Sequence, residues 1–171
     1  MGDLRANAVR MRELLDHLLE RESAFPHFYC DDKGLVTIAI GYLVDQVNAN
    51  DDAGKRLARQ LASRATVGFT DARGMGASLD EVERDWMRVK QYGRTNPRSR
   101  ARDYARVSQL RISRTAMFAI TESVVTKFID QLYIKRPFVM NYDPRVAMAF
   151  VDIRYNAAGV ALYANHGNVQ Q

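Results

Sequence analysis

The chain has few of the residues that build cross-linked or fibrous proteins. Its 171 residues include one cysteine, ten glycines and four prolines. A single cysteine cannot form an intramolecular disulfide, nor a zinc site built from several thiolates. The low glycine and proline content, with 47% hydrophobic residues, excludes the disordered, collagen-like and fibrous classes. We therefore expect one globular domain over residues 1–171.

Long apolar runs are also missing. No uninterrupted run approaches the roughly 20 residues that a membrane span needs. The first 22 residues are charged throughout, where a signal peptide needs an apolar stretch. We therefore expect no membrane insertion and no export signal. The net charge of +5 favours a polyanionic partner such as nucleic acid, anionic lipid or bacterial cell wall, without choosing among them.

The first third of the chain predicts a helix followed by a hairpin. Apolar residues repeat every three or four positions between residues 7 and 22, as in an amphipathic helix. Pro26 prevents that helix from continuing. Two apolar, β-branched and aromatic segments then flank a turn cluster at Asp32, Lys33 and Gly34. This pattern predicts a β-hairpin over residues 27–44.

The remaining two thirds predict mainly helices. One helix is expected over residues 53–65, and a capping box of Ser78 and Glu81 begins another that reaches Tyr92. Ser113 is a suitable N-cap for a long apolar helix that ends before Pro137. Asp143 and Pro144 are typical of the start of a last helix. Its expected apolar stripe consists of Val146, Ala149, Phe150 and Ile153, and Ala147, Met148 and Val151 fill other faces. Because apolar residues surround most of this helix, we expect it to be central.

Two carboxyl groups near the hairpin have the types and surroundings that glycosidases use. Glu22 continues the apolar face of the first helix at its C-terminal end, where burial and the helix dipole favour the protonated form. Asp31 lies at the hairpin turn, where water and turn amides favour the charged form. Such a pair suits one acid and one group that guides water. On these residues alone the commoner alternative is open, because a Glu at a helix end and an Asp in a turn are usually solvated surface groups. Thr37, on the second strand, could hold that water.

The spacing of these three residues is similar to that of a known family. Glu22, eight residues, Asp31, five residues and Thr37, continuing as Thr-Ile-Ala-Ile-Gly, resembles the T-even phage lysozymes, glycoside hydrolase family 24. The resemblance implies a muramidase that cleaves the β-1,4 bond between N-acetylmuramic acid and N-acetylglucosamine in peptidoglycan with inversion. It implies that Glu22 is the general acid and that Asp31 and Thr37 position the water. Ala39 replaces a family glycine, a small-for-small change, and Tyr42 stands where the family commonly has His.

The resemblance extends, more loosely, to the back of the chain. Residues 113–159 are similar to the family's lobe-connecting and central helices, and Tyr155 and Asn156 match an aromatic-amide motif that lines its cleft. Residues 45–111 resemble the segment that ordinarily closes the family's chain, so the larger lobe would be built in permuted order and these residues would cover the central helix. In that order Arg98, or less favourably Arg100, takes the place of the arginine that pairs with the catalytic Glu22.

The expected fold is therefore a mainly helical α+β, two-lobed lysozyme-like domain. The hairpin lobe is expected over about residues 24–50, and the helical lobe over residues 1–23 and 51–171. We expect an enzyme of the lysozyme type without a cofactor. No metal is expected, since His17, His27 and His166 lack the spacing of metal ligands.

Alternatives of other classes remain open. One is a catalytically silent lysozyme-fold module that binds glycan or protein. Another is an arginine-rich helical nucleic-acid binder, although no groove-reading motif accompanies the arginines. A lysozyme without a signal peptide would act on the periplasm or wall of a target bacterium after release by a holin, as an endolysin, or injection by a secretion machine, as a toxin effector. The effector would require a cognate immunity or inhibitor protein, and peptidoglycan is the expected substrate.

Overall fold

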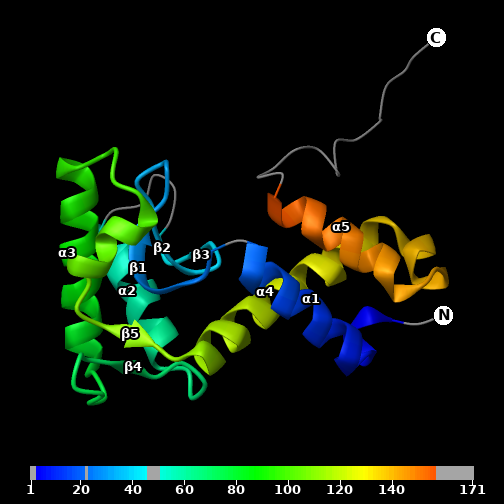
Figure 1. The fold of residues 1–171 in the computed structure, drawn as a ribbon, viewed down its shortest axis with the longest axis horizontal. Coiled ribbons are helices and arrows are strands. Elements are labelled where there is room, and N and C mark those ends of the chain that lie inside the picture. Colours follow the sequence, from blue (N-terminus) through cyan, green and yellow to red (C-terminus); the bar gives the residue numbers. More distant parts are fainter. Residues whose placement is uncertain (1–2, 22, 46–50, 157–171) are drawn as a thin grey trace, which may run out of the picture. The chain divides into compact units, whose positions relative to one another are not determined.

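The computed structural model describes residues 3–21, 23–45 and 51–156, with side chains described as far as Ile153. The chain divides into two compact units. Unit one comprises Met1–Leu18 and Ser123–Gln171, and unit two comprises Leu19–Glu122. The chain is α+β and mainly helical, with a small antiparallel sheet (Figure 1). This confirms the coarse fold class that the sequence predicts.

Unit two contains the predicted hairpin, extended by a short third strand. Strands β1 (Phe25–Cys30), β2 (Val36–Ala39) and β3 (Tyr42–Leu43) form an antiparallel sheet in that order. Tyr29 lies opposite Thr37, and the register shifts between Phe25 and Tyr29. All four residues of β2 are buried, because it is the central strand and is covered on both faces. The hairpin expected over residues 27–44 is therefore confirmed.

Helices pack around this sheet. Helices α2 (Asp51–Ala62) and α3 (Leu79–Thr95) contact each other, and α3 also contacts β1 and β2. The predicted capping box at the start of α3 is present, with both Ser78 and Glu81 making their bonds. A 3₁₀ helix, η2 (Ala101–Arg106), contacts β1. Strands β4 (Phe69–Thr70) and β5 (Arg111–Ile112) pair antiparallel, and two-residue strands carry too little pattern to be predicted.

The core of unit two depends on two glycines on helices. Trp86 of α3 is fully buried, and its ring fills the space where a side chain at Gly54 of α2 would begin. A Cβ at Gly54 would lie 2.1 Å from Trp86 Cζ2. A Cβ at Gly93 of α3 would lie 2.5 Å from Cys30 Sγ on β1. Helix α3 thus approaches α2 and β1 at points where only a hydrogen fits.

Residues 51–111 pack with the hairpin inside unit two. Their buried side chains join those of β1 and β2 in one core, which includes Phe28, Ile38, Leu61, Val89 and Tyr104. The resemblance instead predicts that these residues belong to the helical lobe and cover the last helix. The predicted permuted order therefore gains no support from this packing.

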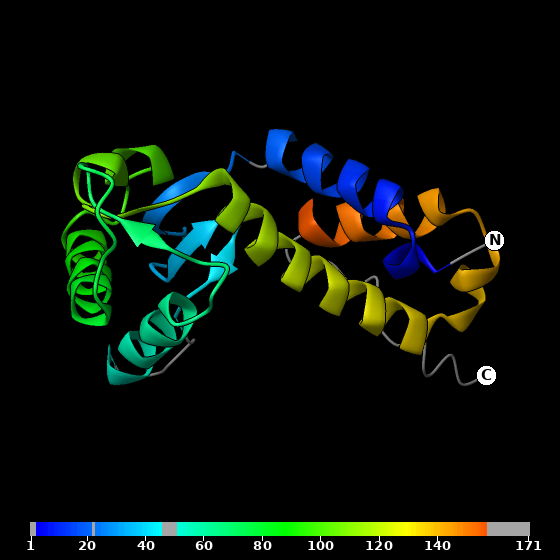
Figure 2. The ribbon, with the colours of Figure 1, turned by 90° about the horizontal axis from the view of Figure 1, so that it is seen from below.

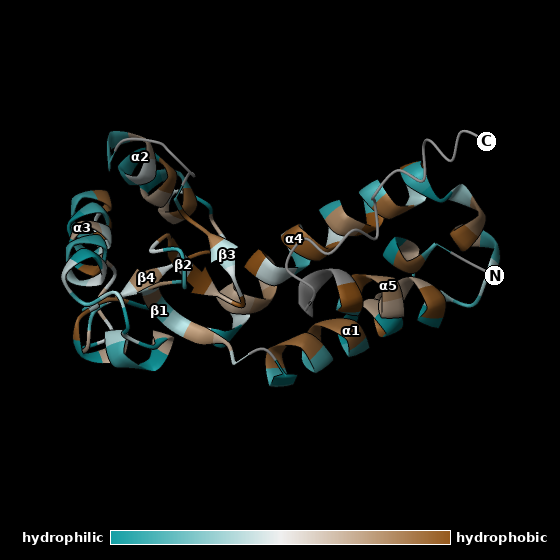
Figure 3. Cartoon of the chain, turned by 90° about the horizontal axis from the view of Figure 1, so that it is seen from above, coloured by the Kyte–Doolittle hydropathy of each residue, from teal (hydrophilic) through white to brown (hydrophobic). Residues whose placement is uncertain are grey.

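Unit one is an assembly of helices. It contains η1 (Leu4–Ala6), α1 (Ala8–Arg21) as far as Leu18, α4 (Arg114–Lys135) from Ser123, η3 (Pro137–Asn141) and α5 (Pro144–Asn156). Figure 2 shows the helices, and in Figure 3 hydrophobic and hydrophilic stretches alternate along α1 and α4. None of the helices among the described residues is both long and apolar enough to cross a membrane. The buried hydrophobic residues of unit one that come from its three α-helices are Met11, Leu14, Leu15, Leu18, Val125, Ile129, Leu132, Tyr133, Ala147 and Val151.

The chain start is tied to the helices of unit one. The Leu4 amide donates a hydrogen bond to the Tyr133 hydroxyl at 2.9 Å, and the side chain of Leu4 is fully buried. Arg5 pairs with Asp130 of α4 at 2.6 Å. Helix α1 begins and ends within a residue of its predicted bounds, and α4 ends at Lys135, before Pro137 as expected. The Ala116 amide donates to Ser113 Oγ, which confirms that predicted N-cap.

The predicted stripe of α5 is not its buried face. Helix α5 starts at Pro144 as expected, and Asp143 Oδ1 accepts a hydrogen bond from the Arg145 amide. Its buried residues are Ala147 and Val151. The four stripe residues instead line a surface hollow of about 570 Å³, and Ile153 is 47% exposed. A helix that is apolar around most of its circumference gives no unique buried face, which is why this prediction was wrong.

Gly54→Ala tests the packing of α3 on α2. Helix propensity alone would make the variant more stable by about 1 kcal/mol. We expect it instead to lose about 3 kcal/mol of unfolding free energy, because the added Cβ cannot coexist with the Trp86 ring. Urea unfolding followed by fluorescence of the lone tryptophan measures this loss. Gln60→Ala, at an exposed position of α2, is the control and should change stability by less than about 0.5 kcal/mol.

Candidate functional site

Asp31 holds the turn between β1 and β2. Its Oδ1 accepts hydrogen bonds from the backbone amides of Lys33 at 2.9 Å and Leu35 at 2.8 Å. The Asp31 amide donates to the Leu35 carbonyl, and the Gly34 amide donates to the Asp31 carbonyl. Gly34 has a φ of +73°, which glycine adopts without strain. The carboxyl group therefore has one orientation, and no described residue donates a hydrogen bond to its Oδ2.

Thr37 is connected to Asp31 through one peptide unit. Thr37 is 3% exposed, and its hydroxyl donates to the Leu35 carbonyl at 3.0 Å. Leu35 thus gives its N–H to Asp31 and its C=O to Thr37. Because the hydroxyl proton is used in this bond, the lone pairs of the Thr37 oxygen are what it can offer to a water molecule. The low exposure of Thr37 was not evident from the sequence.

A pocket of about 380 Å³ lies beside the Asp31 turn. The turn forms one wall, and the second half of α3 forms another through Lys90, Gly93 and Arg94. Lys90 Nζ donates to the Gly34 carbonyl at 2.9 Å and pairs with Asp45 Oδ2 at 2.6 Å. The side chains of Lys90 and Asp45 are 14% and 3% exposed. This little-exposed ion pair attaches the turn to α3, so α3 helps to position Asp31.

The end of β2 carries backbone strain. Ala39 has a φ of +55°, in the left-handed region that disfavours residues with a Cβ by about 1–2 kcal/mol. The sequence comparison, in which Ala39 replaces a glycine of the lysozyme family, does not reveal this cost in free energy. Nearby, the Gly41 amide donates to the Tyr29 hydroxyl at 3.2 Å. Burial raises the pKa of Tyr29 to about 12, so its hydroxyl stays protonated at neutral pH.

The other predicted site residues are only partly described. Glu22 lies outside the described residues, and so do the side chains of Tyr155 and Asn156, which end α5. Tyr42 is half-buried on β3, and its hydroxyl accepts a hydrogen bond from Arg64 at 3.0 Å. Arg98 is exposed between α3 and η2. Thr37 and Tyr42 lie on the same sheet, but Tyr42 pairs with Ile38 and so belongs to the opposite face from Thr37. Asp31 lies in the turn beside that sheet, and the pairing of Arg98 with Glu22 stays a prediction.

A second turn of the chain has the same construction as the Asp31 turn. Asp71 Oδ1 accepts from the Arg73 and Met75 amides, both at 2.9 Å, and Gly74 has a φ of +79°. The shared sequence Asp-x-Lys/Arg-Gly could have revealed it. Since both aspartates make the same turn bonds, these bonds alone do not distinguish a catalytic aspartate from a structural one.

The part of the chain that the structure describes contains no group of three or more His, Cys, Asp or Glu side chains that could hold a metal ion. His27 is 4% exposed, and burial lowers its pKa. Its Nε2 lies 3.2 Å from the Ala101 carbonyl, so this ring joins β1 to η2. His17 is instead half-exposed on α1, 3.3 Å from Asp152. The contacts that these two histidines make fit a structural role.

Lys90→Met tests whether the Lys90–Asp45 pair supports the turn. Removing Lys90 takes an ammonium group away from the buried Asp45 carboxylate and a donor away from the Gly34 carbonyl, so we expect a loss of about 3 kcal/mol of unfolding free energy in urea. The control is Lys33→Met, since Lys33 is exposed and lines the same pocket. This control should lose less than about 0.5 kcal/mol. Equal losses in the two variants would contradict the supporting role of Lys90.

No family model, curated protein or solved structure matches this chain. Its function is therefore argued from the residues and geometry described above. The feature that bears most on function is the hairpin, with Asp31 in its turn and Thr37 on its second strand.

Proposed function

We propose that the chain is a peptidoglycan hydrolase, a muramidase that cleaves the β-1,4 bond between N-acetylmuramic acid and N-acetylglucosamine. The fold we propose is the two-lobed one of the T-even phage lysozymes. The observation that carries the proposal is the spacing of Glu22, Asp31 and Thr37, together with the Leu35 peptide unit that links the last two. A helix that ends at Arg21 and a hairpin that starts at Phe25 bracket Glu22 in the order the resemblance implies.

In the proposed reaction Glu22 protonates the glycosidic oxygen as the sugar departs. Asp31 Oδ2 accepts a proton from the attacking water, since Oδ1 is already occupied by two turn amides. A lone pair of the Thr37 oxygen accepts the second hydrogen of that water and so orients it. Attack from the face opposite the leaving group inverts the anomeric carbon, which requires room for water between the two carboxyl groups.

The supporting residues belong to the same proposal. Arg98 would pair with Glu22 and hold it near the bond to be cleaved. Tyr42, Tyr155 and Asn156 would contact the sugar chain. No metal or cofactor is needed, because two carboxyl groups suffice for this chemistry. The enzyme would act in the wall of a target bacterium, delivered by a holin or a secretion machine. An injected toxin would require an immunity protein that blocks the cleft.

One observation favours a different class of function. Arg98, Arg100 and Arg102 are exposed, and among the described residues none of them forms a salt bridge with a carboxylate. Such a group of arginines is typical of a surface that contacts phosphates. A nucleic-acid binder predicts DNA affinity that falls steeply with salt and is unchanged in Glu22→Gln. Filter binding at two salt concentrations separates this alternative from the muramidase.

The muramidase is tested by the release of muropeptides from purified peptidoglycan, followed by chromatography and mass spectrometry. We expect reducing-end muramic acid from the wild type and at least about a hundredfold less from Glu22→Gln and Asp31→Asn, since each removes a group that moves a proton. Asp71→Asn is the matched control, because Asp71 makes the same turn bonds. It should lose similar stability and keep its activity within about twofold.

Two outcomes of this experiment would contradict the proposal. Release that is equal in the wild type and Asp31→Asn would show that the wrong carboxyl group has been named. No release by the folded wild type from several kinds of wall would leave the catalytically silent binding module as the better hypothesis.

Arg98→Ala tests the supporting role of Arg98. We expect about a tenfold or greater loss of kcat with little change in melting temperature, because an exposed arginine contributes little to stability. Arg102→Ala, at an exposed position of η2, is the control and should retain activity. A normal rate in Arg98→Ala would reject the permuted assignment on which its role depends.

A further inference from the structure

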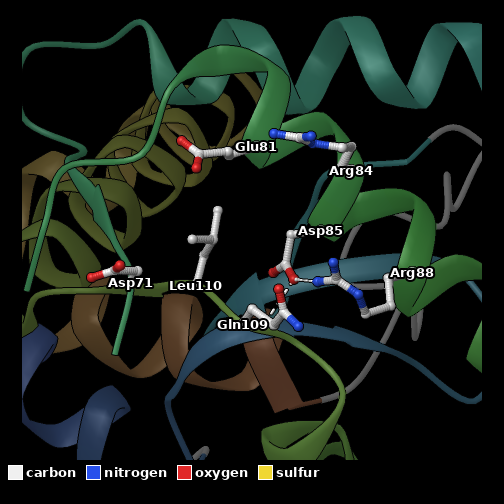
Figure 4. A pocket seen from close by; sticks show the side chains of 7 residues that line it. All are labelled: Asp71, Glu81, Arg84, Asp85, Arg88, Gln109 and Leu110. Atoms are coloured by element: carbon white, nitrogen blue, oxygen red, sulfur yellow. Dashed lines mark hydrogen bonds and ion pairs between the residues drawn. The ribbon is translucent and has the colours of Figure 1, made fainter. Parts of the chain in front are cut away.

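A second pocket in unit two, of about 340 Å³, lies along the first half of α3 (Figure 4). It is away from the Asp31 turn in sequence and shares no lining residue with the pocket there. Its wall combines opposite charges around a buried leucine. The residues of this wall on which the argument depends are Glu81, Arg84, Asp85, Arg88, Gln109 and Leu110.

Asp85 fixes one side of this pocket. It is 1% exposed, and its Oδ2 accepts from the Ser108 hydroxyl at 2.6 Å. Its Oδ1 accepts from the Gln109 amide at 2.7 Å and from Arg88 Nη1 at 2.5 Å. A buried carboxylate with three donors is well satisfied, and it holds the Arg88 guanidinium in a defined position. Arg88 is only half-buried, so its remaining N–H groups can reach a ligand.

Glu81 is fixed in a different way. Its Oε2 accepts from the Ser78 amide at 2.7 Å and from the Ser78 hydroxyl at 2.8 Å. These hydrogen bonds lower the pKa of Glu81 below its usual value, so the group is charged at neutral pH. No described residue donates a hydrogen bond to its Oε1. The capping box thus presents one carboxylate oxygen to the pocket.

Arg84 supplies a second cation. It is exposed and forms no salt bridge with a described carboxylate, although its charge helps to lower the pKa of Glu81. Arg84 lies four residues before Arg88, so both guanidinium groups project from the same face of α3. In the view of Figure 4, Glu81 and Arg84 lie next to each other above Leu110, and Arg88 lies to the right of Leu110, beyond Asp85. Beside the satisfied Asp85, the pocket therefore offers one carboxylate group and two guanidinium groups.

We propose that this pocket binds a ligand with an ammonium and a carboxylate on the same carbon, the α-amino acid group. The carboxylate would contact Arg84 and Arg88, and the ammonium would contact Glu81 Oε1. The aliphatic part would lie on Leu110, which is 5% exposed. Glu81 would repel a simple anion, and the two guanidinium groups would repel a simple cation. A zwitterion offers a partner to the groups of both signs.

Asp71 also lines the pocket but is not a ligand group. Its Oδ1 is occupied by the amides of its own turn, and its Oδ2 bonds to Arg73. In Figure 4 its carboxylate is directed away from Leu110. The ligand would therefore depend on Glu81, Arg84 and Arg88 rather than on Asp71.

The α-amino acid group could come from two sources. One is a free amino acid. The other is the free end of a diaminodicarboxylic acid in the peptide stem of peptidoglycan, and this second source rests on the proposed function. A lysine side chain offers only the ammonium, so the pocket would distinguish the two kinds of stem.

The test uses meso-2,6-diaminopimelate as the probe and the full chain as the receptor. Binding is followed through NMR shifts of the Gln109 and Leu110 amides. We expect saturation with a Kd on the order of 1 mM, as for a small ligand with few contacts. Pimelate, which lacks the ammonium groups, and 1,5-diaminopentane, which lacks the carboxylates, should bind at least about tenfold more weakly. Equal binding of either analogue would overturn the proposal.

Two variants connect the binding to this pocket. Glu81→Gln keeps the capping box, since glutamine also serves in that motif, and Arg84→Gln removes the exposed cation. Each should weaken diaminopimelate binding by about tenfold or more. Arg56→Gln, at an exposed position of α2, is the control and should not change it. No saturable shift in the wild type, or equal affinity in all variants, would overturn the proposal.

A disaccharide-tripeptide that ends in diaminopimelate distinguishes the two sources. Binding tighter than that of the free amino acid identifies the stem, and binding of the free amino acid alone identifies a small-molecule site. Both results support the zwitterion pocket. The titration is carried out in Glu22→Gln, so binding without cleavage remains measurable. Failure of the muramidase proposal and failure of this one therefore give different results.

Discussion

The close approach of α3 to its neighbours is the constraint on which unit two depends. Trp86 fits against α2 only because Gly54 has no side chain, and α3 lies against β1 only because Gly93 has none. Both pockets of unit two discussed above are built along this one helix. Its N-terminal and middle turns provide Glu81, Arg84 and Arg88, and its C-terminal turns provide Lys90 and Arg94. Two separate pockets therefore depend on the same two contacts between a glycine and a neighbouring side chain.

Local sequence signals predicted the elements that depend on interactions between residues close together in the sequence. The apolar period of α1, the capping box of Ser78 and Glu81, and the Asp143-Pro144 start of α5 each act within one or two helical turns. Features that depend on distant residues were not predictable in this way. The fit of Trp86 over Gly54 joins two helices, and the strands β4 and β5 pair across about forty residues of chain. The prediction of the buried face of α5 was wrong for the same reason. Contacts with distant residues determine which of its several apolar faces is buried.

In the candidate site, too, some features could be predicted from the local sequence and others depend on distant residues. Spacing alone pointed to Asp31 and Thr37, and the hairpin connects them through the Leu35 peptide unit. Spacing could not indicate that Thr37 is almost fully buried, or that Lys90 and Asp45 attach the turn to α3. Those facts depend on how residues 51–111 pack against the sheet. The spacing thus points to candidate groups, while the packing of residues 51–111 determines how firmly these groups are held.

The construction of the Asp31 turn affects how a chain with the proposed activity could change during evolution. The carboxylate proposed to move a proton is also the group that closes the turn, as its counterpart Asp71 does where no reaction is proposed. Selection for folding alone would preserve an aspartate at this position in a descendant that no longer cleaved any substrate. An aspartate at this position in a related chain would therefore not by itself indicate activity, because the turn requires the same side chain.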